Sequence, residues 1–267
     1  MVDPGAPARV LTEVARGVWT ATAEIWTSLT TVVVDEDGTC LVVDPGITVG
    51  ELDGLAAALR VRGWRPVAGF STHPHWDHLL WADALGDVPR WATAVAATTA
   101  ASLHADIAAE TREAAPGHDD ALLGRVTALP AGAGEIPWSG PRAVVVQHAG
   151  HAAGHAALVL PETGVLVVGD MLSDLEIPLL DRDAADPVAD YRTALDLLQA
   201  AALTHRITTV IPGHGHVGAG NELDRRLAAD RTYLDDLVAG RESHDERLAT
   251  PWLAREHEAQ GRRIAPR

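Results

Sequence analysis

Two kinds of apolar pattern alternate along this sequence. Short runs rich in Val, Ile and Thr, bounded by turn residues, predict strands at 17–23, 29–35, 39–43, 66–72, 143–147, 156–160, 165–168 and 207–211. Apolar residues three or four positions apart predict helices at 49–62, 79–85, 93–113, 190–202 and 222–237. Beyond Gly240 the pattern is weak, although Trp252 and Leu253 can pack this tail against the rest.

The order of these elements predicts the architecture. A block of strands followed by helices occurs twice, and no Pro-, Gly- or Ser-rich linker separates the two blocks. We therefore expect residues 1–267 to form one α/β (α+β) domain in which two sheets pack together with helices outside.

Composition narrows the classes of function. The chain has 21 basic and 37 acidic residues and a net charge of −16, which argues against binding to nucleic acid or to an anionic membrane. All the basic residues are Arg, so mechanisms that need a lysine are excluded. No apolar run reaches the roughly 18 residues of a membrane span, and the N-terminus does not resemble a signal peptide. We expect a cytoplasmic protein, and the Ala- and Arg-rich composition is typical of a GC-rich bacterial genome.

Cysteine and histidine usage points to imidazole chemistry. Cys40 is the single cysteine, which excludes an internal disulfide and a multi-cysteine metal site. It lies in an apolar run and is expected to be buried as a small hydrophobic residue. The 13 histidines are therefore the natural carriers of chemistry.

Polar clusters follow four of the predicted strands. In an extended segment His73 and His75 point to the same side, and the turn after them brings Asp77 and His78 to a second position nearby. The other clusters contain His148, His151 and His155, then Asp170, and finally His214 and His216. Clusters at strand ends can converge on one edge of a sheet sandwich, so we expect a metal site there.

Five motifs occur along the chain in the order in which the metallo-β-lactamase superfamily has them, and the sequence resembles that superfamily. Its H-x-H-x-D-H signature reads as residues 73–78, its strand-end Asp-x-Gly as 44–46, and its G-H-x-x-G-H segment as 150–155. Gly169-Asp170 and Gly213-His214 complete the series. The resemblance covers most of the chain and implies a four-layer αββα sandwich of two mixed β-sheets with outer helices.

The resemblance also implies roles for individual residues. His73, His75 and His151 would hold a first metal, Asp77, His78 and His214 a second, and Asp170 would bridge the two. Asp44 would orient a ligand histidine, and His155 would brace the loop. His148 and His216 have no assigned role.

The chemistry of these ligands favours hydrolysis. Imidazole and carboxylate ligands without thiolate suit two Zn²⁺ ions, with Fe or Mn as alternatives. Two dications lower the pKa of a bridging water to about 7 and so provide a hydroxide at neutral pH. Asp77 would be catalytic as well as a ligand, because it can take or return a proton. We therefore expect a dinuclear zinc hydrolase.

Departures from known subfamilies narrow the substrate. His75 stands where flavodiiron proteins carry Glu, and Cys40 precedes the first motif, unlike the ligand Cys of β-lactamases in this superfamily. Only about 50 residues follow His214, fewer than glyoxalase II typically has there. We expect a small-molecule ester, lactone or thioester as substrate, with Trp76 and Tyr191 as candidate substrate contacts.

Further aromatic and acidic residues lie near the predicted site. Trp26 and Trp81 fit a pocket wall and the core equally well. The segment 171–186 is expected to lie over the site, where its acidic residues disfavour strongly anionic substrates.

Three alternatives remain open at this point. A phosphodiesterase would use the same metals and an Arg-lined pocket, for which Arg182 and Arg192 are candidates. A mononuclear iron sulfur dioxygenase would use the same motif, and a non-catalytic metal-binding protein is the third alternative. We expect a small-molecule substrate, no nucleic acid and no membrane as partners. The oligomeric state is open, with a homodimer among the options.

Overall fold

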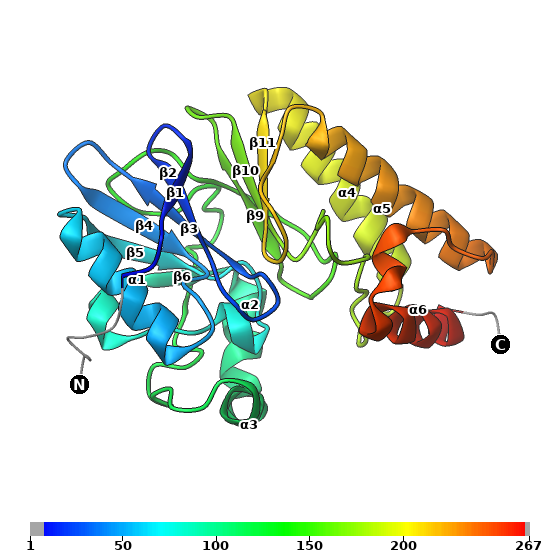
Figure 1. The fold of residues 1–267 in the computed structure, drawn as a ribbon, viewed down its shortest axis with the longest axis horizontal. Helices are drawn as coiled ribbons and strands as arrows, with labels where there is room; N and C mark the ends of the chain where they lie inside the picture. Colours follow the sequence, from blue (N-terminus) through cyan, green and yellow to red (C-terminus); the bar gives the residue numbers. More distant parts are fainter. Residues whose placement is uncertain (1–7, 265–267) are drawn as a thin grey trace.

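The fold contains two mixed β-sheets, and the computed structural model describes residues 8–264 (Figure 1). The first sheet has seven strands in the order β1-β2-β3-β4-β5-β6-β7. Neighbouring strands are antiparallel from β1 to β4 and parallel from β4 to β7. Their bounds are β1 Thr12–Ala15, β2 Val18–Thr22, β3 Leu29–Val34, β4 Thr39–Val43, β5 Arg65–Phe70, β6 Arg90–Ala92 and β7 Thr127–Ala128.

The second sheet has five strands in the order β12-β11-β10-β9-β8. The pair β10 and β11 is parallel, and the other neighbours are antiparallel. The bounds are β8 Val144–Gln147, β9 Ala156–Leu160, β10 Val165–Gly169, β11 Thr209–Pro212 and β12 Gly218–Ala219.

Helices cover the outer face of each sheet (Figure 1). The helices α1 Val49–Val61, α2 Ala94–Ser102 and α3 His104–Ala114 lie on the side of the first sheet, and α4 Pro187–His205 and α5 Glu222–Ala239 on the side of the second. The last helix, α6 Pro251–Ile264, packs against α5. Short 3₁₀ helices are η1 Trp76–His78, η2 Asp83–Leu85 and η3 Glu246–Ala249.

Alternation along the strands explains the layers. In β3, Val32 faces α1 whereas Val33 faces the other sheet, because successive strand side chains point to opposite faces. In β9, Leu158 faces the first sheet whereas Val159 faces α4 and α5. Both sheets are thus buried on both faces, and three apolar cores separate four layers. This confirms the expected αββα sandwich of two mixed sheets.

The helix α1 shows how local sequence sets an element. Its N-cap is Thr48, whose side chain accepts a hydrogen bond from the backbone N–H of Glu51. The Glu51 carboxylate accepts one from Thr48 in return, which completes a capping box. Leu52, Leu55 and Leu59 are then buried on the face that covers the first sheet.

The structure corrects several predicted elements. The expected helix at 93–113 is two helices, α2 and α3, separated at Leu103, and the expected helix at 79–85 is reduced to η2 with its neighbour η1 before it. The tail beyond Gly240 contains α6, anchored by the buried Leu253, rather than weak structure. Asn221 lies at the N-cap of α5 but makes no side-chain capping hydrogen bond. The sequence pattern also missed the short strands β1, β6, β7 and β12.

One further property concerns membranes. Within residues 8–264, no helix combines the length and the apolar character needed to cross a bilayer.

Candidate metal centre

The expected metal-ligating residues lie at one edge of the sandwich, where parallel strands end. The parallel neighbours β4 and β5 are followed by Asp44 and His73, and the parallel neighbours β10 and β11 by Asp170 and His214. Carboxyl ends of parallel strands meet at the same sheet edge, so the fold brings these segments together.

Backbone hydrogen bonds join the two sheets at this edge. The N–H of Ala156, at the start of β9, donates to the carbonyl of Thr72 after β5, at 2.9 Å. The N–H of Leu29, at the start of β3, donates to the carbonyl of Gly213 after β11, at 2.7 Å. The two halves of the site are therefore held in register by main chain, not only by side chains.

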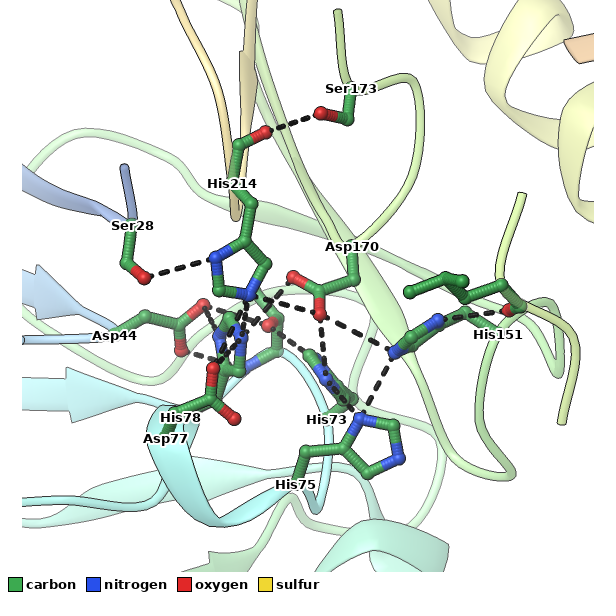
Figure 2. A network of polar contacts seen from close by, with 12 residues as sticks. Ser28, Asp44, His73, His75, Asp77, His78, His151, Asp170, Ser173 and His214 are labelled. Carbon is green, nitrogen blue, oxygen red and sulfur yellow. Dashed lines mark hydrogen bonds and ion pairs between the residues drawn. The ribbon is translucent and has the colours of Figure 1, made fainter. Parts of the chain in front are cut away.

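The first donor group consists of His73, His75 and His151, and Figure 2 shows their rings pointing toward one another. Nδ1 of His75 lies 3.0 Å from Nε2 of His73 and 3.0 Å from Nε2 of His151. Oδ2 of Asp170 completes the set, at 3.5 Å from Nε2 of His73 and 3.4 Å from Nε2 of His151.

The second donor group consists of Asp77, His78 and His214 (Figure 2). Oδ2 of Asp77 lies 3.3 Å from Nε2 of His78 and 3.3 Å from Nε2 of His214, and the two nitrogens are 3.4 Å apart. Oδ1 of Asp170 lies 3.2 Å from Nε2 of His78. Oδ2 of Asp170, which faces the first group, also lies 3.3 Å from Nε2 of His214. Asp170 thus lies between the two groups and contacts both, as expected of a bridging carboxylate.

The spacing of these atoms fits divalent metal. Four donors placed tetrahedrally around zinc at about 2.0–2.1 Å are separated from one another by roughly 3.3 Å. The distances of 3.0–3.5 Å in the first group and 3.2–3.4 Å in the second match that separation. Oδ1 of Asp170 is moreover buried without a hydrogen-bond partner among the described residues. Each group is a candidate site for one metal ion.

In four of the ligand histidines, the ring nitrogen that points away from the donor centre, here called the outward nitrogen, has a hydrogen-bond partner of its own. His73 uses Nδ1 to contact Oγ1 of Thr72 at 3.0 Å, and His78 uses Nδ1 to contact Oδ2 of Asp44 at 2.9 Å. Nδ1 of His151 contacts the carbonyl of Leu179 at 3.0 Å, and Nδ1 of His214 contacts Oγ of Ser28 at 3.0 Å. These contacts fix the ring orientation and direct Nε2 of all four rings into the centre.

The electrostatics of the two groups differ. Burial, together with neighbouring histidines, lowers the pKa of His151 to about 4 and that of His73 well below its usual value. Burial also opposes protonation of His78 and His214, but Asp170 and Asp77 outweigh it and hold the pKa of both rings well above the usual value. The first group is thus a set of neutral imidazoles, whereas the carboxylates of the second attract positive charge.

Close approach of the backbone shapes the site. A Cβ atom at Gly213 would collide with Oδ1 of Asp170 and lie 3.0 Å from Cε1 of His78. Asp44 and His151 adopt the left-handed conformation, with φ of 47° and 71°. Such conformations cost about 1–2 kcal/mol in residues other than glycine, so surrounding contacts must hold both in place.

The motifs contain three further histidines, which lie in different surroundings. His155 is fully buried, stacks on His73 with ring centroids 4.8 Å apart, and accepts a hydrogen bond at Nε2 from the backbone N–H of Asp170. His148 stacks on the other face of His155 at 4.5 Å. His216 points to solvent and pairs with Asp174 at 2.8 Å.

A cavity of about 680 Å³ opens over the donor atoms. Trp76 and Trp26 line it, and their rings meet edge to face at 5.7 Å. Trp81 belongs to the core instead, where its indole N–H donates to the carbonyl of Gly86.

Tyr191 does not line this cavity, contrary to expectation. It is buried between α4 and α5, and its hydroxyl donates to Asp230 at 3.4 Å. Its position on the apolar face of α4 gives it a packing role.

The two arginines considered for phosphate binding are already paired. Arg182 lines the cavity and contacts Glu256 of α6 at 2.9 Å. Arg192 lies outside it and pairs with Asp235 of α5.

Sequence reasoning missed part of the cavity wall. Trp252 and Glu256 of α6 line the cavity, as does Glu176 from the segment 171–186. Gln260 of α6 holds that segment, because Oε1 accepts a hydrogen bond from the N–H of Leu180 at 2.6 Å and Nε2 donates to the carbonyl of Pro178 at 3.1 Å. Neither contact has a local sequence signal, although the amphipathic spacing within residues 251–264, which the interpretation of a weakly patterned tail missed, is typical of a helix.

The site and the fold together define the class of protein. Residues 25–214 match the family model of the metallo-beta-lactamase superfamily. The match covers more than half of the chain, so the protein belongs to this superfamily, whose members are in general metal-dependent hydrolases.

Comparison with individual proteins adds structural likeness. A beta-lactamase domain protein from Burkholderia ambifaria has a TM-score of 0.66 and 23% identity, over 89% of this chain and 80% of its own. The DIM-1 metallo-beta-lactamase, exposed to ceftazidime, has a TM-score of 0.62 and 19% identity, over 85% of this chain and 98% of its own. The sec-alkylsulfatase Pisa1 from Pseudomonas sp. has a TM-score of 0.66 and 15% identity, over 96% of this chain and 50% of its own.

These identities are low, so the likenesses show the fold alone. No curated protein matches the sequence.

Proposed function

We propose that this protein is a dinuclear zinc hydrolase that cleaves a small ester, lactone or thioester. The observation that carries the proposal is the pair of donor groups sharing Asp170, whose carboxylate contacts histidines of both groups. A site that holds two ions side by side in this way suits hydrolysis better than simple storage of a metal.

The residues of each group would hold one ion. His73, His75 and His151 would bind the first, and Asp170 would contribute to both. When bound, two zinc ions supply an activated water and polarise the oxygen of the scissile group. Thr72, which contacts the outward nitrogen of His73, and the other outer partners keep the ligand rings fixed while substrate binds and leaves.

Asp77 is the residue of the centre best placed to move a proton. Within residues 8–264 all its hydrogen bonds and ion pairs involve Oδ2, which faces His78 and His214. Asp77 also lines the cavity, so Oδ1 is available to a leaving group there. We assign to it the return of a proton to the departing alcohol or thiol.

The cavity favours a small substrate without strong negative charge. Its volume of about 680 Å³ lies within the range of small-molecule sites. A phosphodiester would need unpaired cationic side chains, but Arg182, the arginine of the cavity wall, is neutralised by Glu256. The lining therefore favours a carboxylic ester, lactone or thioester over a phosphodiester.

Metal analysis tests the proposal. We expect protein purified without added metal to contain about two zinc ions per chain, and the variant Asp170→Ala to contain less than one. Asp183→Ala, which removes an exposed acid of the cavity rim, serves as the matched control and should keep both ions. One iron per chain would contradict the proposal in favour of a dioxygenase, and unchanged metal content in Asp170→Ala would contradict the assigned ligands.

Hydrolysis provides the second test. The wild-type protein should hydrolyse representative aryl esters, lactones or thioesters, and chelator treatment should abolish the activity. Hydrolysis confined to phosphodiesters would contradict the proposed substrate class.

A further inference from the structure

The wall of the cavity is far more acidic than the rest of the chain. Apart from the donor residues, five acidic residues and one basic residue line it, whereas the whole chain has 37 acidic and 21 basic residues. The basic residue, Arg182, is itself paired with one of the acids. The acidic residues are Glu110, Glu176, Asp181, Asp183 and Glu256.

Glu176 is the acidic residue set deepest in this wall. Burial raises its pKa to about 7, and within residues 8–264 its carboxyl group has no hydrogen bond or ion pair, so an ammonium group bound beside it would favour its charged form. Its backbone is held from both sides, because the N–H donates to Oγ of Ser173 and the carbonyl accepts a hydrogen bond from Arg247 at 2.8 Å. The carboxylate therefore has a fixed backbone and no cationic partner of its own.

Indole rings stand beside these carboxylates. Trp26 and Trp252 line the cavity although they are 48% and 36% exposed, and Trp76 is nearly buried and meets the ring of Trp26. Trp26 also lies edge to face with the donor His214, with ring centroids 6.0 Å apart. Trp26 and the next residue, Thr27, both adopt the left-handed conformation, with φ of 54° and 53°. Two successive strained residues are costly, and here they hold a large apolar ring at the mouth of the cavity.

Aromatic faces combined with unpaired carboxylates are how proteins bind organic cations. An ammonium group gains from the quadrupole of the indole and from the nearby negative charge, while its alkyl groups are removed from water. A neutral ligand of the same shape gains only from the removal of its alkyl groups from water. An anionic ligand is repelled by the wall.

We propose that the natural substrate carries an ammonium group, which Trp26, Trp76 and Glu176 hold while the scissile bond lies over the donor groups. This inference rests on the proposed hydrolase function and names its substrate class, a cationic ester, lactone or thioester. The negative wall and a metal-loaded floor would orient such a substrate, with its cation toward the wall and its carbonyl oxygen toward the metals.

Binding of matched ligands separates charge from shape. Choline and 3,3-dimethylbutan-1-ol have nearly the same size, but in the second a carbon replaces the quaternary nitrogen. In calorimetric titrations of the protein as purified, we expect choline to bind about five-fold or more tightly than the neutral alcohol. Equal affinities, or tighter binding of the alcohol, would overturn the inference.

Variants locate the recognition surface. Trp26→Ala and Glu176→Gln should each bring the ratio of the two affinities close to one. Glu258→Gln removes an acidic residue of α6 that lies outside the cavity, and this matched control should keep the wild-type ratio. A wild-type ratio in both cavity variants, with their folding verified by circular dichroism, would overturn the assignment of this wall.

A pair of esters separates this inference from the proposed function. Hydrolysis of acetylcholine adds water across the acyl C–O bond and gives choline and acetate with release of one proton, and 3,3-dimethylbutyl acetate reacts in the same way. We expect a higher kcat/KM for acetylcholine. Equal kcat/KM values would support the hydrolase and overturn the cationic preference. Tight binding of choline without hydrolysis of either ester would support the cation site and contradict the proposed activity.

Discussion

The two donor groups are built from the same residue types but differ in charge. The first has three imidazoles, and its outward nitrogens contact a hydroxyl and a backbone carbonyl. The second has two imidazoles and Asp77, and one of its rings contacts the carboxylate of Asp44. Carboxylate behind an imidazole raises its basicity, so the second group should bind a dication more tightly. For the proposed dinuclear site, this difference predicts that the second group fills first.

The largest expected effect comes from removing one ligand from each group. His75→Ala should retain one tightly bound zinc ion in the second group, whereas His214→Ala should retain less than one and bind it more weakly. Both variants should lose at least about a hundredfold in activity, because loss of a mere orienting partner already costs roughly 10–100-fold. Elemental analysis after dialysis measures how much zinc each variant retains and so checks which group binds zinc more tightly.

His244→Ala, at an exposed position far along the chain, is the control for this pair and should keep both ions. Equal zinc retention in His75→Ala and His214→Ala would contradict the difference between the groups.

A second substitution displaces the carboxylate of Asp170 without replacing that residue. In Gly213→Ala the added methyl group would collide with Oδ1 of Asp170 and crowd the ring of His78. We expect a loss of about 1–3 kcal/mol in the free energy of unfolding and weaker zinc binding, chiefly in the second group. Urea denaturation and zinc titration measure both quantities.

Gly134→Ala is the matched control, because a Cβ there meets no atom within 4 Å. Wild-type zinc affinity in Gly213→Ala would show that the centre tolerates movement of Asp170.

Removing the different partners of the outward nitrogens should weaken zinc binding to different extents. Asp44 accepts hydrogen bonds from both the N–H and Oγ1 of Thr72 in addition to its contact with His78, so Asp44→Asn disturbs both groups. Zinc affinity should fall by roughly 10–100-fold. Ser28→Ala removes only the contact to His214 and should cost a few-fold. Similar losses in the two variants, measured by competition with a chelator, would contradict a special role for Asp44.

The last expected effect is on the free energy of unfolding rather than on zinc binding, and it concerns pH on the side of the first group. Burial lowers the pKa of His148 to about 4, whereas in the unfolded chain it titrates near 6.5. Between these values the unfolded state binds more protons, so stability falls as pH falls from about 6.5 to 4. His148→Phe keeps the stack on His155 but removes this ring's contribution to the dependence, which amounts to about 3 kcal/mol over the full range.

Urea denaturation at several pH values measures the slope for His148→Phe. The exposed position His244, changed to Phe, provides the control and should keep the wild-type slope. An unchanged slope in His148→Phe would show that this ring contributes no pH dependence to folding.

The placement of the donor residues could be predicted because it depends on local sequence. His73, Asp170 and His214 each follow directly after a strand whose apolar run is unmistakable, and the strand order then fixes their meeting. The main strands and the αββα layers follow from the same runs. The short strands β6 and β7 have two or three residues, too few for a pattern to distinguish them from loops.

Other features depend on contacts between distant segments. Ala-rich sequence at 93–113 fits one helix or two, and the structure has two, with Ile107 of α3 buried in the core on the outer side of the first sheet. Ser28 gives no sign in the sequence that it will contact His214. Tyr191 could have been placed correctly, because it shares the spacing of the buried Leu195 and Leu198 on α4.

The attachment of α6 to the segment 171–186 has a consequence for how this protein can diversify. The family match ends at residue 214, with the last of the donor residues, whereas Trp252, Glu256 and Gln260 lie beyond it. Part of the cavity wall is therefore contributed from outside the region that carries the donor residues. Substitutions in the last helix can therefore change the shape and charge of the cavity mouth while all seven donor residues stay unchanged.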